Sequence, residues 1–176
     1  MEQENKEGCV VKAMQKLKIV LLLIAQSRLL SGAVLSLPAD TTHRIIVLET
    51  TECYGTCPVQ KLEIFAGGLV RYQGIKHTKL KGTYALKLRK SDLERLSKRF
   101  RTARFFEFKD SYQQKVSDLP TTYLTFSDGG RTKTILDYYG TPEAVKQLER
   151  GVLALLERKG WRKIKASRED SRDAFE

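Results

Sequence analysis

The sequence predicts an α+β domain, in which an antiparallel sheet of about five strands has two helices packed on one face. Two hairpins and two amphipathic helices carry this prediction. The hairpins are marked by Gly67-Gly68 and by Asp128-Gly129-Gly130, because tight turns between antiparallel strands need residues that tolerate positive φ. A segment with the 3.6-residue period of a helix follows after each hairpin. This order of elements is typical of a sheet covered on one side.

The first half of the domain contains the strands that the pattern marks most clearly. Residues 45–50 are apolar on both faces of the pleat, which suits a strand inside the sheet. Residues 60–66 alternate between apolar and polar, and with residues 69–73 they form the first hairpin. Residues 82–88 form the next strand.

The first helix is predicted to open at Ser91. Ser91 and Glu94 have the spacing of a capping box, in which each side chain binds an amide of the first turn. Leu93, Leu96 and Phe100 share one face of this helix. The aromatic residues after it are expected to fill the core: Phe105, Phe106 and Phe108.

The second half repeats the plan. Residues 110–120 form a polar loop, and residues 121–127 and 132–138 form the second hairpin. Thr141 is the expected N-cap of the last helix and Pro142 its first residue. Trp161 is expected to pack back onto the core. The apolar stripe of this helix is Val145, Leu148, Val152 and Leu155.

Residues 1–39 have the pattern of a signal peptide rather than of the fold. Lysines precede the apolar run 19–25, and small residues follow, with cleavage expected after Ala33 or Ala39. The alternatives are an uncleaved membrane anchor, which Arg28 interrupts early, and a core helix. We therefore expect one domain at residues 40–163, a charged tail at 164–176, and a periplasmic or extracellular location. The leader would contact the membrane during export.

Cys53 and Cys57 form the one conspicuous pair among three cysteines. Gly55 lies between them, and this loop can bring the two Cα atoms within the roughly 4.4–6.8 Å that a disulfide requires. In an oxidising compartment we expect a structural disulfide. The alternative is thiol–disulfide redox chemistry, although that favours a Cys-x-x-Cys turn at a helix N-terminus. Zinc would need two further ligands, and only His43 and His77 are available, so no metal or other cofactor is expected.

The motif Cys53-Tyr54-Gly55-Thr56-Cys57-Pro58 resembles that of a bacterial family defined only as a domain of unknown function, in which the aromatic position is Tyr or Phe. The resemblance covers roughly residues 45–161. It implies an exported or envelope-associated domain and no activity, cofactor or catalytic residue. The basic surplus and the basic tail depart from the family. The other matching stretches are residues 48–49, 67–74, 118–122 and 133–140.

Four residues of the second half are candidates for a polar pocket: Asp110, Asp118, Asp137 and Tyr138. The alternative is structural, with Asp118 ordering a turn and Asp137 pairing with a lysine. No serine lies in a nucleophile elbow and no glycine-rich phosphate loop precedes a helix, so the sequence favours a non-enzymatic role.

Positive charge is concentrated in one part of the chain. The formal net charge is +11, and residues 71–109 contain thirteen Lys or Arg and three acidic residues. Such a surface binds anions. We therefore predict an exported binding or interaction module, with an anionic envelope polymer, a lipid head group or a protein as partner. A nucleic-acid binder is a further alternative, which would require that the leader be retained.

Overall fold

The computed structural model describes residues 42–115 and 118–165. The predicted leader at 1–39 lies outside these residues, and so does the predicted tail at 164–176 except for its first two residues. Nothing in the structure tests export or the limits of the predicted domain at 40–163, which stay predictions.

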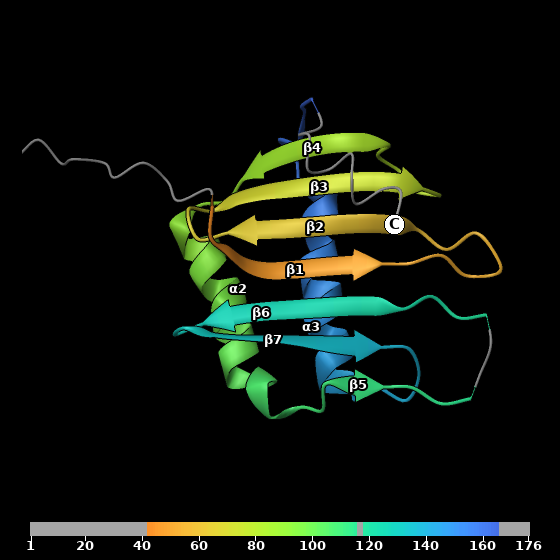
Figure 1. Ribbon diagram of the computed structural model, residues 1–176. Helices are drawn as coiled ribbons and strands as arrows, with labels where there is room; N and C mark the ends of the chain where they lie inside the picture. The colour runs from red at the N-terminus through yellow and green to blue at the C-terminus, as the bar shows by residue number, and fades with distance from the viewer. Residues whose placement is uncertain (1–41, 116–117, 166–176) are drawn as a thin grey trace, which may run out of the picture. The chain divides into compact units, whose positions relative to one another are not determined.

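Over the described residues the chain forms one sheet of eight strands, with two helices (Figure 1). The elements are β1 Arg44–Thr50, β2 Val59–Phe65, β3 Leu69–Lys76, β4 Gly82–Lys87, α2 Lys90–Thr102, β5 Ser111–Tyr112, β6 Thr122–Asp128, β7 Arg131–Asp137, α3 Glu143–Leu153 and β8 Arg162–Lys163. The 3₁₀ helices η1 (Phe105–Glu107) and η2 (Ala154–Glu157) follow α2 and α3. The strand order is β5-β7-β6-β1-β2-β3-β4-β8.

The α+β class is confirmed, but the sheet is larger than the predicted five strands. It is also mixed, because β5 runs parallel to β7 while every other pair is antiparallel. β5 lies inside the segment that the sequence marks as a polar loop, and β8 follows the last helix. Each of these two strands has two residues, which is too short for an alternating pattern to appear in the sequence.

The hydrophobic core lies between the sheet and the helices, which cover the same face of the sheet (Figure 1). One row of paired residues crosses five strands on this face, and none of its side chains is more than 1 % exposed: Tyr72, Leu62, Leu48, Leu124 and Ile135. The helices contribute the buried side chains that their stripes predict: Leu96, Phe100, Val145, Leu148 and Val152.

Aromatic side chains fill the two ends of this core. Phe100 stacks on Phe126 with 4.7 Å between ring centroids, and Phe105 meets both rings. Trp161 contacts Tyr72 edge-on at 5.8 Å. The predicted core positions of Phe105 and Trp161 are therefore confirmed.

The predicted start of the first helix is wrong. α2 begins at Lys90 with Arg89 as its N-cap residue, and no side chain caps it, so Ser91 lies inside the first turn. The Arg89 guanidinium instead donates to Asp92 at 3.0 Å. Because a charge-assisted hydrogen bond is stronger than a neutral one, this contact orders the first turn in place of the capping box.

The predicted N-cap of the last helix is also wrong. The N-cap residue of α3 is Pro142, and no side chain caps this helix. The Thr141 hydroxyl donates to Oδ1 of Asp137 at 2.6 Å. A hydrogen bond to a carboxylate is stronger than one between neutral groups, so this contact orients the Thr141 side chain.

Candidate functional site

A groove of about 480 Å³ lies between α2 and α3. None of its lining residues is acidic, and three carry positive charge. The lining residues are Arg95, Lys98, Arg99, Thr102 and Ala103 from the first helix and its end, and Ala144, Gln147 and Leu148 from the second.

Helical spacing explains why the cations gather in this groove. Arg95, Lys98, Arg99 and Thr102 are three, four and seven residues apart, so they share one face of α2. The neighbouring face buries its apolar side chains against the sheet. On α3 the groove residues follow the same spacing of three and four. The amphipathic pattern that builds the core therefore also places the cations side by side at the helix–helix boundary.

The cations of the groove differ in how they are held. An Nη atom of Arg99 donates to the Gln147 carbonyl of α3 at 3.2 Å, which ties the guanidinium across the groove. Nη1 of Arg95 lies 3.4 Å from Oδ1 of Asp92, at the border of the groove. Lys98 has no hydrogen bond or ion pair within the part of the chain that the structure describes. Its ammonium group is exposed and available to an anion.

Gly151 of α3 makes room for Arg99. A Cβ atom at residue 151 would lie 2.5 Å from Nη1 and 2.9 Å from Cζ of that guanidinium. Glycine inside a helix is unfavourable relative to alanine. The absence of a side chain at this position therefore lets the arginine cross toward α3.

At the start of α2 a carboxylate neutralises the nearby arginines. Asp92 is buried and accepts hydrogen bonds from Arg158 at 3.0 Å and from Arg89 at 3.0 Å. These two hydrogen bonds lower the pKa of the Asp92 carboxyl to about 2. This cluster joins α2 to the end of η2, and its arginines serve the fold.

Asp137, one of the predicted pocket residues, belongs to a buried pair of carboxyl groups. Lys146 of α3 forms an ion pair with Asp137, and its Nζ lies 3.7 Å from Oε2 of Glu149. Burial and then the hydrogen bond to Asp137 raise the pKa of Glu149 to about 8. Burial also acts to raise the pKa of Asp137, but hydrogen bonds from Glu149, Lys146 and Thr141 outweigh it and lower that pKa. At neutral pH the two groups share one proton, which Glu149 carries.

Glu149 was absent from the sequence-based candidates. Its position in the sequence could have identified it. Glu149 is four residues after Val145 and three before Val152, so it lies within the apolar stripe of the helix. A carboxyl group on a buried helix face needs a partner in the core.

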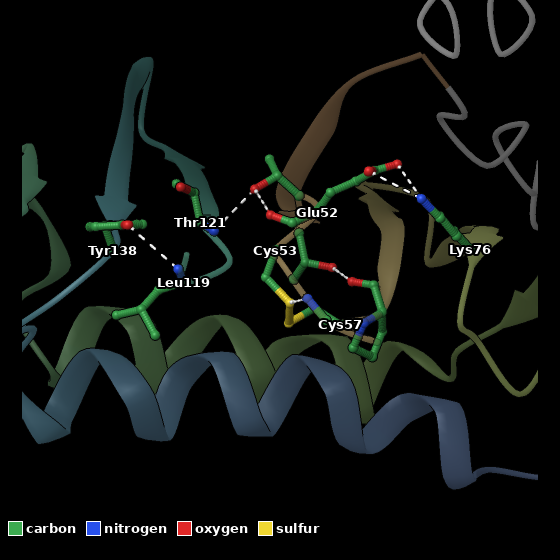
Figure 2. Close-up of a disulfide and its surroundings, with 11 residues drawn as sticks. Glu52, Cys53, Cys57, Lys76, Leu119, Thr121 and Tyr138 are labelled. Atoms are coloured by element: carbon green, nitrogen blue, oxygen red, sulfur yellow. Dashed lines mark hydrogen bonds and ion pairs between the residues drawn. A yellow bond between two sulfur atoms is a disulfide. The ribbon is translucent and has the colours of Figure 1, made fainter. Parts of the chain in front are cut away.

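The other predicted pocket residues have separate partners. Asp110 forms an ion pair with Lys133 at 2.7 Å, and its side chain is 84 % exposed. Asp118 has a positive φ of 71° in an exposed turn. The Tyr138 hydroxyl accepts a hydrogen bond from the Leu119 amide at 3.5 Å (Figure 2). A common pocket of these residues with Asp137 stays a prediction.

The structure joins Cys53 and Cys57 in a disulfide, with 5.7 Å between their Cα atoms. It closes the loop between β1 and β2, and the Tyr54 side chain at the tip of this loop is 90 % exposed. Thr51 and Thr121 exchange hydrogen bonds of 3.0 Å, which fasten the loop to the start of β6 (Figure 2). The Gly55 amide donates to Sγ of Cys53 at 3.2 Å.

The described residues also bear on metal binding and on membrane insertion. Within residues 42–115 and 118–165, no group of three or more His, Cys, Asp or Glu side chains is placed to hold a metal ion. Both histidines of the chain are exposed there. Over the same residues, no helix has the length and apolar character needed to cross a bilayer.

Fold and site together define a small α+β domain with a cationic groove between its helices and a disulfide in its first loop. The chain belongs to the family described as a domain of unknown function, DUF6438, whose model matches residues 44–156. The matched region runs from β1 to η2 and contains both helices, the groove and the disulfide loop. A search of curated proteins found no match. The predicted family type is thus confirmed, while its bacterial and exported character stays a prediction.

Proposed function

We propose that this chain is an exported, non-enzymatic binding module that holds an anionic ligand in the groove between α2 and α3. The observation that carries the proposal is the groove itself, which three cations line and no carboxylate does. Like charges at neighbouring positions of a helix repel one another, and a bound anion relieves that repulsion.

The groove chemistry indicates which anions fit. Arginine presents a planar fork that matches carboxylate and phosphate oxygens, and lysine adds a point charge. Ala144 and Leu148 give the groove an apolar part between the cations. We expect a ligand with phosphate or carboxylate groups, such as an anionic polymer of the cell envelope or a lipid head group.

Two features support an exported setting. The apolar run at residues 19–25, with lysines before it and small residues after it, has the pattern of a signal peptide. The Cys53–Cys57 disulfide suits a compartment in which disulfides persist. An envelope anion is therefore preferred to a nucleic acid.

The proposal is tested by titrating the full chain with inorganic polyphosphate at several salt concentrations. We expect binding that weakens steeply as salt rises, since charge pairing drives it. The double variant Lys98→Glu/Arg99→Glu should weaken binding by about tenfold or more. The matched control is Lys109→Glu/Lys159→Glu, which changes the net charge equally at exposed positions outside the groove. Equal losses in the two variants would reject the groove as the site.

Thiol–disulfide exchange is a second candidate function, which the hydrogen bond from the Gly55 amide to Cys53 favours. A donor to sulfur stabilises the thiolate that leaves when a disulfide is attacked. Equilibration in glutathione buffers, followed by alkylation, measures the reduction potential. A value above about −230 mV would support exchange, whereas a value below about −300 mV would identify a structural disulfide.

A further inference from the structure

A second cavity, of about 200 Å³, lies between β2, β3 and η2, beside the disulfide loop. Gln60 and Tyr72 come from the sheet, and Leu156 comes from η2. The remaining wall is the loop between β3 and β4, which contributes His77, Thr78 and Lys79. This cavity shares no residue with the groove between the helices.

Gln60 gives the cavity a buried polar group with unused hydrogen-bonding capacity. Its side chain is 8 % exposed, and its Oε1 accepts a hydrogen bond from the Tyr72 hydroxyl at 3.1 Å. Within the described part of the chain, the amide NH₂ of Gln60 has no hydrogen-bond partner. This NH₂ group is open to the cavity, so it is able to donate to an acceptor that a ligand brings.

One lysine, Lys79, lies on the wall of the cavity. The neighbouring Lys76 is not part of the wall and pairs with Glu52 at 3.1 Å. The one carboxylate on the wall is Glu157, which lies 3.7 Å from Lys79, and both of these side chains are more than three-quarters exposed. Such an exposed pair contributes little and is easily exchanged for a better partner. A carboxylate on a ligand is therefore able to replace Glu157 as the partner of Lys79.

The wall of the cavity is held in place by the backbone. Gly74 of β3 lies under the loop, and a Cβ atom there would collide with the Leu80 carbonyl oxygen and the Thr78 hydroxyl. The Thr78 hydroxyl donates to that same carbonyl at 3.0 Å, so the loop satisfies its own polar groups. His77 has a positive φ of 54°, which is uncommon for a residue other than glycine. The loop thus has a defined conformation around the cavity.

We propose that this cavity binds a small carboxylate. One carboxylate oxygen accepts from the Gln60 amide, and Lys79 balances the charge at the rim. Leu80 and Leu156 provide apolar walls for a short carbon chain. This site does not depend on the proposed function of the groove, because a different surface and a different ligand carry it.

The test is NMR of the full ¹⁵N-labelled chain during titration with sodium butyrate. The side-chain amide signals of Gln60, assigned by their absence in Gln60→Met, should shift and saturate with a dissociation constant of about 1–10 mM, which is ordinary for so small a ligand. Lys79→Ala, at an exposed position, should keep the fold and weaken binding several-fold. Lys98→Glu/Arg99→Glu should leave the response unchanged.

Two results would overturn the carboxylate site. One is the absence of a saturable shift at Gln60 up to about 100 mM butyrate, since that excludes even millimolar binding. The other is an equal response to sodium chloride at the same ionic strength or to neutral butanol, because neither brings a carboxylate. Loss of polyphosphate binding to the groove would affect neither result.

Discussion

The two ends of α2 use their positive charges in different ways. At its start, Arg89 and the distant Arg158 hold the buried Asp92 carboxylate. Further along, Lys98 and Arg99 face a groove whose lining has no acidic residue. The same basic helix therefore has cations that serve the fold and cations that are left for a ligand. The net positive charge of a sequence does not show which cations stabilise the fold and which are available to a ligand. The position of the Asp92 carboxylate in the structure does show it.

The largest expected effect comes from removing that carboxylate. Asp92→Ala removes the buried carboxylate that accepts hydrogen bonds from Arg89 and Arg158 and so joins α2 to the end of η2, so we expect a clear fall in the free energy of unfolding and in Tm. Lys98→Ala should stay within about 0.5 kcal/mol of the wild type, as exposed substitutions usually do. Urea denaturation of both variants measures the difference. Similar losses of stability in the two variants would contradict the view that the arginines around Asp92 stabilise the fold whereas Lys98 does not.

The next effect is a pH dependence that contrasts Asp92 with Glu149. The pKa of Glu149 is raised to about 8 from 4.5 in the unfolded chain, so its contribution is complete below pH 4.5 and is lost as pH rises through 8. The pKa of Asp92 is lowered to about 2 from 3.8, so its contribution is complete above 3.8 and is lost as pH falls through 2. Stability from these two groups is therefore greatest near pH 4.

Variants separate the two limbs of that profile. Glu149→Gln should abolish the loss of about 1–3 kcal/mol that we expect between pH 5 and pH 8.5. Asp92→Asn should flatten the acid limb and leave the alkaline limb in place. Thermal unfolding across pH measures both. An alkaline limb that survives in Glu149→Gln would show that another group causes it.

The smallest expected effect comes from a substitution at Gly151, which lies next to the Arg99 guanidinium. Gly151→Ala should leave stability unchanged or raise it by up to about 1 kcal/mol, because alanine is the better helix former. The new Cβ atom should also displace the Arg99 guanidinium, which we expect to weaken polyphosphate binding about threefold. Unfolding and titration on the same sample separate the two effects. Unchanged binding would show that the position of Arg99 does not matter.

The sequence predicted the parts of the fold that have a local signal. Glycine turns located both hairpins, and the apolar period located the buried faces of both helices. Helix starts were misplaced because Asp92 and Asp137 draw Arg89 and Thr141 into contacts that replace ordinary caps. Those contacts depend on which groups are buried together, and local spacing does not show this.

The candidate site was predicted less completely. Four residues of separation suffice to suggest the Cys53–Cys57 disulfide. The basic run at 71–109 was apparent, but the sequence could not show which of its cations meet α3, since the groove exists only once two distant helices pack together. The unused amide of Gln60 was equally hidden, because its partner Tyr72 and the covering loop come from other segments.

The groove is tested most directly by locating polyphosphate on the protein with NMR. We predict that the largest shifts fall on the side-chain signals of Arg95 and Arg99 and on the backbone amides of Lys98 and Gln147, and that they diminish as salt is raised. Shifts concentrated on residues 76–81, or spread evenly over all lysines and arginines, would contradict a binding site between the helices.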